Sequence, residues 1–218
     1  MELLERLAAV RADVARAAVE AGRDPAAITT IVVTKFHPQQ LVRDLYDLGV
    51  RDFGESRHQE AEAKIADLGD LDGVTWHFIG QLQSKKARQV ATYSDVVHSV
   101  DRDALLSPLA GVPSFLQVNL TDDPGRGGVA PGDIEQLAET ATASGVPVLG
   151  LMAVAPLGEQ PRRAFAAVRE MSQRLATVVP GASALSMGMS GDFADAIKEG
   201  ATHLRIGTAI TGNRPAKG

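Results

Sequence analysis

Lys35 is the residue of this sequence best suited to covalent chemistry. It follows the apolar, β-branched run Ile28–Thr34, which is typical of a strand buried on both faces. A lysine at a strand end is usually a solvated surface cation. A lysine that is desolvated or lies near another cation can instead lose its proton and attack an aldehyde to form a Schiff base. The position alone leaves both interpretations open.

Two glycine-containing stretches have the composition of a phosphate-binding site. Ser186–Ser190 and Arg205–Thr208 both place Gly beside Ser or Thr, so that backbone N–H groups can approach an anion and hydroxyls can add hydrogen bonds. The stretch Ser190–Asp192 also opens a predicted helix, whose N-terminal dipole favours an anion. A Schiff-base lysine, two phosphate loops and Arg205 together suggest pyridoxal 5'-phosphate as the ligand.

The pattern of apolar residues predicts an α/β fold with eight helix-then-strand units. The predicted helices cover 2–21, 41–48, 57–68, 84–92, 102–109, 133–144, 162–178 and 192–199, and the strands cover 28–34, 50–53, 74–79, 95–99, 113–118, 146–152, 184–187 and 202–206. Eight such units favour a single (β/α)8 TIM-type barrel over an open sheet. One helix precedes the first strand and almost nothing follows the last, so we expect the N-terminal helix to complete the outer ring.

This barrel would bring the candidate residues together. The active site of such a fold lies where the strands end, and loops after the seventh and eighth strands commonly bind phosphate. Lys35 follows the first strand, and the two glycine-containing stretches follow the last two. The longest irregular stretch, 120–133, is either a mobile flap on the same rim or a solvated turn. No linker divides the chain, so residues 1–218 are expected to form one domain.

The composition excludes several classes of function. The 218 residues carry a net charge of −5, and nonspecific nucleic-acid and membrane-surface binders normally carry a basic excess. The absence of cysteine excludes disulfides and thiolate chemistry. We expect a cytoplasmic protein, because neither a signal peptide nor an apolar run of membrane-spanning length is present. No heptad pattern or long apolar stripe indicates an obligate dimer, so a monomer is expected.

Other reactive side chains are more simply explained by packing. His77, His98 and His203 lie on predicted strands and are expected to be hydrogen-bonded core residues. The five histidines show no close pair at metal-ligand spacing, so no zinc site is expected. Glu55 either takes up a proton in the mouth of the barrel or pairs with a neighbouring basic residue.

Five motifs in order make the chain resemble a known family. They are Val33–Lys35, Gly49–Glu55, Trp76–Ser84, Ser186–Ser190 and Arg205–Thr208, and the resemblance extends from about Leu3 to Gly212. The family is that of the pyridoxal phosphate homeostasis proteins, also called the YggS or PROSC family, whose fold is similar to the N-terminal barrel of alanine racemase.

The resemblance implies a role for each candidate residue. It makes Lys35 the aldimine lysine and places Arg205 opposite the pyridine nitrogen. It makes Ser190, Gly207 and Thr208 the phosphate ligands, with Ser186 and Met187 lining the same end. Ser56 stands where the family commonly has Asn, so its contact with the cofactor is an open question.

Three functions compete on this reading. The first is a carrier or buffer that holds pyridoxal phosphate and passes it transiently to apo-enzymes without turnover. The second is an amino-acid racemase, which would need an opposing base; the only tyrosines, Tyr46 and Tyr93, lie within or at the end of predicted helices, away from the rim. The third is a barrel enzyme whose lysine forms an imine with a sugar phosphate. The five motifs favour the carrier.

Overall fold

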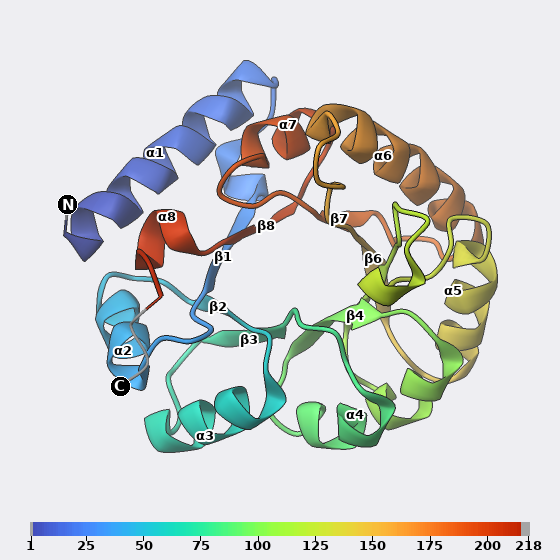
Figure 1. Cartoon of the computed structure of the whole chain (residues 1–218), viewed down its shortest axis with the longest axis horizontal. Helices are drawn as coiled ribbons and strands as arrows, with labels where there is room; N and C mark the ends of the chain where they lie inside the picture. Colours follow the sequence, from blue (N-terminus) through green and yellow to red (C-terminus); the bar gives the residue numbers. More distant parts are fainter. Residues whose placement is uncertain (1, 215–218) are drawn as a thin grey trace.

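The computed structural model describes residues 2–214 as a closed barrel of eight parallel strands. The strands pair in chain order, and β1 pairs with β8 to close the ring (Figure 1). Their bounds are β1 Thr29–Val33, β2 Asp52–Glu55, β3 Thr75–Phe78, β4 Val96–Val100, β5 Ser114–Gln117, β6 Val148–Met152, β7 Ala184–Ser186 and β8 His203–Ile206. The predicted fold class is therefore confirmed.

Helices form an outer layer around the strands, as the ribbon in Figure 1 shows. The α-helices are α1 Leu3–Glu20, α2 Gln39–Asp47, α3 His58–Leu68, α4 Ser84–Val90, α5 Ile134–Ala143, α6 Pro161–Val178, α7 Phe193–Lys198 and α8 Thr208–Thr211. Short 3₁₀ turns are η1 Pro25–Ala27, η2 Asp103–Leu105, η3 Ser107–Leu109 and η4 Pro124–Arg126. Between residues 2 and 214, no helix combines the length and the hydropathy that a membrane crossing requires.

Two details differ from the prediction. The helix expected over 102–109 is instead the pair of 3₁₀ turns η2 and η3, because Pro108 lacks an N–H and disfavours helical backbone at Ser107. The last strand is followed by the short helix α8, where almost nothing was expected. Helix α1 packs against α7 and α8 and so completes the outer ring as predicted.

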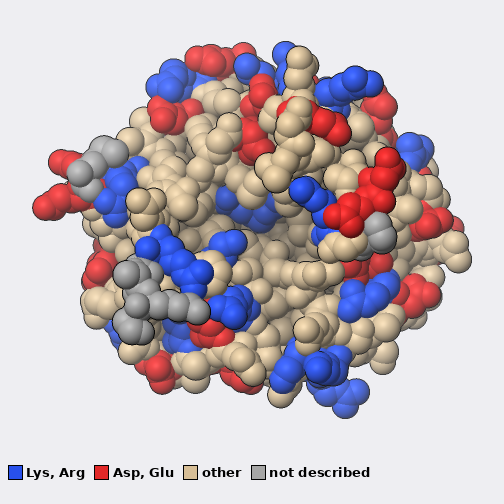
Figure 2. Space-filling model, in the orientation of Figure 1, with Lys and Arg blue, Asp and Glu red and all other residues tan. Residues whose placement is uncertain are grey.

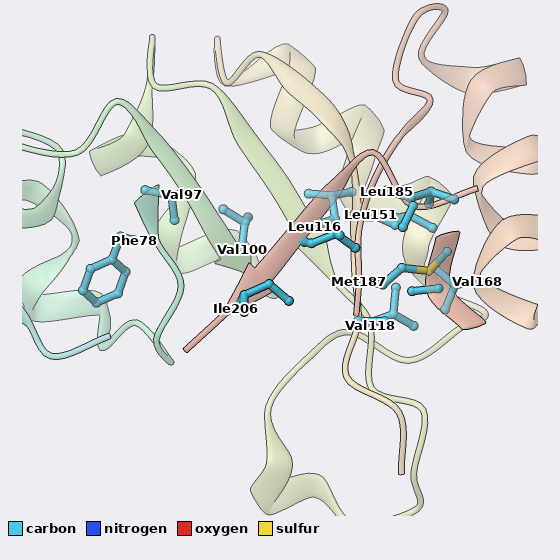
Figure 3. Packing of buried hydrophobic residues seen from close by; sticks show 14 of the residues in the cluster. Phe78, Val97, Val100, Leu116, Val118, Leu151, Val168, Leu185, Met187 and Ile206 are labelled. Carbon is cyan, nitrogen blue, oxygen red and sulfur yellow. The ribbon is translucent and has the colours of Figure 1, made fainter. Parts of the chain in front are cut away.

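The main hydrophobic core lies between the strands and the helices. Alternate strand residues point outward into this layer, among them Leu116 of β5, Leu151 of β6 and Ile206 of β8 (Figure 3). Val168 of α6 meets them from the helix side. Burial of this apolar layer fixes which face of each strand turns inward, because the two faces alternate along a strand.

The inward faces of the strands carry a mixture of apolar and polar side chains. Apolar residues that are buried but stand apart from the outer cluster are Ile31, Val33, Phe115 and Met152. The polar ones are His77, His98, His203, Ser186 and Arg205. Ring centroids of the three imidazoles and Phe115 lie 4.5 to 6.4 Å apart. The barrel interior is thus a packed, partly polar core.

Candidate functional site

The candidate site lies at the face of the barrel where the strands end. A space-filling view of this face shows a central hollow with Lys and Arg side chains in and around it (Figure 2). Asp and Glu side chains lie mainly toward the periphery. Lys35 is exposed directly beyond β1, and Gly207 and Thr208 follow β8. Because β1 and β8 are paired, these residues lie on neighbouring strand ends. This charge distribution suits an anionic ligand.

The turn that carries Lys35 has an unusual backbone conformation. Phe36 has a φ of 68°, in the left-handed region that bulky residues rarely occupy. Three cations surround its ring: the guanidinium carbons of Arg214 and Arg57 lie 4.0 and 5.5 Å from the ring centroid, and Lys35 Nζ lies 5.9 Å away. Cation–π attraction at such distances offsets part of the backbone strain. The surrounding contacts therefore favour one shape for this turn.

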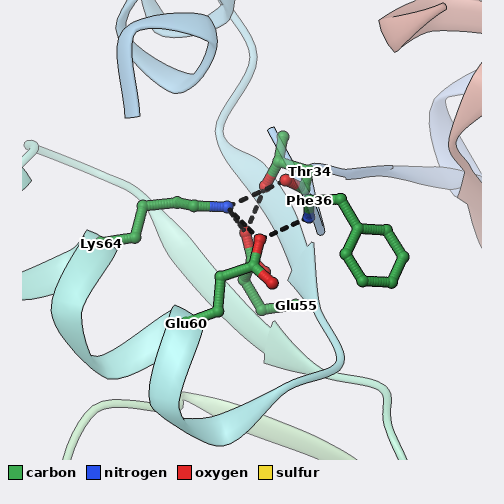
Figure 4. Close-up of polar contacts among 5 residues, drawn as sticks. All are labelled: Thr34, Phe36, Glu55, Glu60 and Lys64. Carbon is green, nitrogen blue, oxygen red and sulfur yellow. Dashed lines mark hydrogen bonds and ion pairs between the residues drawn. The ribbon is translucent and has the colours of Figure 1, made fainter. Parts of the chain in front are cut away.

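A buried cluster of charges, which we call the acid–lysine cluster, holds this turn from below (Figure 4). Lys64 of α3 donates to Glu55 Oε1 at 2.6 Å and to the Thr34 carbonyl at 2.9 Å. Thr34 Oγ1 donates to the same Glu55 oxygen at 2.8 Å. Glu60 lies 3.5 Å from Lys64 Nζ and accepts the Phe36 N–H. The residues on both sides of Lys35 are thus fixed by one network.

Glu55 is the electrostatic centre of the acid–lysine cluster. Burial raises the pKa of Glu55, against the opposing effects of the Lys64 ammonium and the Thr34 hydroxyl. Its second oxygen, Oε2, is buried without a hydrogen-bond partner among residues 2–214. Of the two roles expected for Glu55, the structure shows the ion pair with a basic residue. Lys64 and Glu60 themselves were not singled out from the sequence.

The phosphate-like end of the site is formed by the loops after β7 and β8. The backbone N–H groups of Ser190, Gly191 and Thr208 have no acceptor among residues 2–214. Ser190 Oγ accepts a long hydrogen bond of 3.5 Å from Ala209 N, which links the two loops. A side chain at Gly191 would meet no atom within 4 Å. Free donors and open space together fit a phosphate group.

Arg205 is buried beneath this end and makes three hydrogen bonds within the chain. Its Nη1 donates to Ser186 O and Ser186 Oγ, both at 2.7 Å, and its Nη2 donates to Ala153 O at 2.9 Å. A guanidinium has five donors, so the Nε–H and one Nη2 hydrogen have no acceptor among the described residues. Burial lowers the pKa of Arg205 to about 10, which keeps it a cation at neutral pH.

Ser186 and Met187 are placed differently from the other predicted ligands. Ser186 Oγ lies in the barrel interior, where it contacts Arg205 and His98. The side chain of Met187 belongs to the outer hydrophobic core (Figure 3), so only its backbone can face the mouth. Ser186 Oγ is therefore buried against Arg205 and His98 rather than open to a ligand.

A cavity of about 530 Å³ opens beside the Lys35 turn, at the ends of β2 and β3. It is lined by Ser56–Glu60, Phe78, Gln81–Gln83 and Lys86. Gly80 allows its two walls to meet, because a Cβ at this position would come within 2.0 Å of the Ser56 carbonyl oxygen. Ser56, the position that departs from the family pattern, thus lies on the rim of the site.

The other predictions fare as follows. His77, His98 and His203 are largely buried and hydrogen-bonded, as expected.

The 120–133 stretch holds the turn η4, in which Asp123 accepts from Gly125 N; its mobility stays a prediction. The two tyrosine hydroxyls are engaged, with Asp72 O at 3.3 Å and His58 Nδ1 at 3.2 Å. No group of three metal-ligating side chains occurs in residues 2–214.

Comparisons with known proteins agree with this fold. The family model "Alanine racemase, N-terminal domain" matches residues 7–215. A pyridoxal phosphate homeostasis protein of Pseudomonas aeruginosa is 42% identical over 97% of this chain and 96% of its own length. Two structures of PipY from Synechococcus elongatus cover 97% of this chain and all of theirs. The one without pyridoxal phosphate is 37% identical with a TM-score of 0.85, and the one with it bound is 36% identical with a TM-score of 0.82.

Proposed function

The chain belongs to the pyridoxal phosphate homeostasis proteins, a family with the alanine racemase N-terminal barrel, and on that premise we propose that it binds pyridoxal 5'-phosphate as a Schiff base on Lys35. It acts as an intracellular carrier or buffer of this cofactor and passes it to apo-enzymes. The observation that carries the proposal is the convergence of an exposed lysine, unpaired phosphate donors and Arg205 on one barrel mouth.

The residues present fit the cofactor at both of its ends. The free backbone N–H groups of Ser190, Gly191 and Thr208 suit a phosphate, and the open space at Gly191 admits it. Lys35 is exposed at the end of the neighbouring strand β1, where its amine is open to an aldehyde. When bound, the cofactor supplies an electrophilic aldehyde and an electron-withdrawing ring.

Arg205 determines what chemistry the site favours. Its two remaining donors can face a pyridine nitrogen, which would then accept a hydrogen bond from a cation. An arginine cannot receive a proton, and its pKa of about 10 keeps its own proton in place at neutral pH. The ring would stay unprotonated and be a poor electron sink. This limits carbanion chemistry and suits a carrier, or a racemase that has a second acid or base.

The first experiment is a titration of the purified protein with pyridoxal phosphate, followed by visible absorption. We expect a Schiff-base band in the wild type and none in Lys35→Ala. Lys86→Ala is the matched control, because Lys86 lies in the neighbouring cavity and should leave the band in place. A band of equal intensity in Lys35→Ala would reject Lys35 as the binding lysine.

Transfer and turnover need separate measurements. Mixed with an apo-enzyme that requires pyridoxal phosphate, the loaded protein should restore its activity, and a trap for free aldehydes should not abolish that restoration. Racemisation is the competing function, and it is tested by exchange of the α-proton of alanine in deuterium oxide. Rapid exchange on both enantiomers would replace the carrier with a racemase.

A further inference from the structure

An unbroken chain of hydrogen bonds crosses the barrel interior from its far face to Arg205. Asp52 Oδ1 lies 3.0 Å from His77 Nε2, and His77 Nδ1 lies 3.0 Å from His98 Nε2. His98 Nδ1 lies 2.8 Å from Ser186 Oγ, which accepts from Arg205. We call these five residues the interior relay. Its members come from β2, β3, β4, β7 and β8.

The two ends of the interior relay lie on opposite faces of the barrel. Asp52 is the first residue of β2, and its side chain is 32% exposed. The other four members are at most 5% exposed, and Arg205 lies near the mouth. Each member occupies an inward-facing strand position, as the pairing of Gly54 with His77 and of Ser186 with His203 illustrates. The relay therefore connects solvent on one side with the candidate site on the other.

The chemistry of the two ends fixes every proton between them. A guanidinium only donates and a carboxylate only accepts. Ser186 Oγ accepts from Arg205, so its own hydrogen is free to go to His98 Nδ1. His98 then carries its proton on Nε2 and donates to His77 Nδ1. His77 in turn donates from Nε2 to Asp52.

The reversed arrangement would be costly at both ends. The Ser186 hydroxyl hydrogen would lose His98 as its acceptor in a fully buried position, and the unprotonated Nε2 of His77 would face the Asp52 carboxylate. In this arrangement each imidazole carries a proton on Nε2 and accepts at Nδ1. In agreement, burial and the neighbouring His77 and Arg205 hold the pKa of His98 well below its usual range.

We propose that Asp52, His77 and His98 are positioning residues for the cofactor. They fix the His98 tautomer that accepts from Ser186, and Ser186 Oγ in turn holds the Arg205 guanidinium at the angle that leaves two donors for the pyridine end of the ligand. The inference rests on the proposed binding of pyridoxal phosphate at this mouth. It extends the functional unit to a residue on the opposite face of the barrel.

Substitutions at His98 separate this role from simple packing. In His98→Asn the amide oxygen can replace Nδ1 as the acceptor for Ser186, whereas in His98→Gln the amide reaches toward His77 and leaves Ser186 without an acceptor. We expect His98→Gln to weaken pyridoxal phosphate binding by about fivefold to tenfold, the equivalent of one hydrogen bond. His98→Asn should restore most of the affinity although it leaves the larger cavity.

Asp52 tests the far end of the relay. Asp52→Asn removes the charge that selects the tautomer of His77, so we expect the pH midpoint of the bound-cofactor absorbance band to shift. The charged and titratable groups that face the two imidazoles are Asp52, His203 and Arg205, and only the first is changed. Asp70→Asn makes the same charge change at an exposed position of the loop before β3 and should leave the midpoint unchanged.

The outcomes distinguish this inference from the function on which it rests. A normal band in the wild type, with the same affinity and the same pH midpoint in His98→Gln and Asp52→Asn, would reject the relay and leave the carrier proposal intact. Absence of any band in the wild type would reject both. Shifts in the two relay variants, with near-normal His98→Asn and Asp70→Asn, would support the relay.

Nitrogen NMR of the wild-type protein without ligand gives a second test. It requires no substitution, so misfolding of a variant cannot affect the result. We expect the side chains of His77 and His98 to appear as Nε2–H tautomers with protonated and unprotonated nitrogens clearly separated. Exchange-averaged signals, or a proton on Nδ1 of either residue, would overturn the proposed direction of the relay.

Discussion

The Lys35 turn and Arg205, which lie on the neighbouring strands β1 and β8, are supported in different ways. The Lys35 turn rests on the acid–lysine cluster, in which an ammonium and two carboxylates are packed around a strained backbone. Arg205 rests on the interior relay, whose buried links are neutral imidazoles and a hydroxyl. A cluster of buried charges is stable only when every charged partner is present. A chain of neutral hydrogen bonds instead requires that each group donates or accepts in the right direction. The first support is therefore expected to fail through charge loss and the second through geometry.

The largest expected effect is the loss of the ammonium from the acid–lysine cluster. Lys64→Met leaves Glu55 buried with only Thr34 as a partner, and removal of one partner from a buried ion pair costs about 3 to 5 kcal/mol. Chemical denaturation measures this loss. The matched control is Lys85→Met, an exposed lysine that should change stability by less than about 0.5 kcal/mol.

The double variant Lys64→Met with Glu55→Gln sharpens the comparison. Replacing both members of a buried pair is often close to neutral, so we expect the second substitution to recover part of the lost stability. If Glu55→Gln instead added its own loss to that of Lys64→Met, the two side chains would not act as a pair.

Glu55 of the acid–lysine cluster and His203, whose ring lies beside His77 and His98 of the interior relay, should respond to pH with opposite signs. The pKa of Glu55 is raised above its ordinary 4.5, so the native state keeps this proton longer than the unfolded chain does. Its contribution to stability therefore decreases as the pH rises through that window. Burial lowers the pKa of His203 to about 4, so the unfolded chain takes up this proton first. Its contribution decreases as the pH falls below 6.5.

A series of denaturation curves separates these contributions. Between about pH 7 and pH 4, His203 accounts for a loss of at most about 3 kcal/mol, which His203→Asn should remove. Glu55→Gln should instead make the remaining profile steeper on the acid side, because it removes a contribution that acid favours. Parallel profiles for the two variants would show that Glu55 and His203 do not differ in this way.

Substitution of Arg205 probes the geometry of the neutral side at constant charge. In Arg205→Lys an ammonium replaces a planar group that donates to Ser186 O, Ser186 Oγ and Ala153 O. At least one of these buried acceptors should lose its partner, at a cost of about 2 kcal/mol. Arg88→Lys, at an exposed position of α4, serves as the control in the same denaturation experiment. Equal stability of both variants would mean that geometry matters less here than charge.

The sequence predicted the barrel and the residues at its mouth because both follow from local patterns. Alternating apolar runs define the strands, and strand ends define the rim, so Lys35 and Thr208 could be placed without a structure. The supports could not be predicted in the same way. Lys64 lies on α3, for which the sequence predicts only a polar helix. Its contact with Glu55 depends on how closely α3 packs on β2.

The sequence contains part of the information that predicts the interior relay. His77 and His98 were expected to be hydrogen-bonded core residues, and they are. Counting outward and inward positions along each strand would also have placed them on the same side of their strands as Asp52. The contact of Ser186 with His98 depends on the shear of a closed barrel, which brings non-neighbouring strands together, and sequence patterns do not encode it.

The smallest expected effect concerns the cations around Phe36. Arg57→Gln removes one guanidinium at 5.5 Å from the ring, and an exposed cation–π contact contributes about 0.5 to 1 kcal/mol. We expect a loss near the lower figure in chemical denaturation, since Arg214 at 4.0 Å keeps the closer contact. Phe36→Leu should cost more than Arg57→Gln, because it retains the positive φ while removing the ring that all three cations share. If Phe36→Leu were no less stable than Arg57→Gln, the turn that presents Lys35 would be held by the acid–lysine cluster alone, and the contrast between the supports of Lys35 and Arg205 would become sharper.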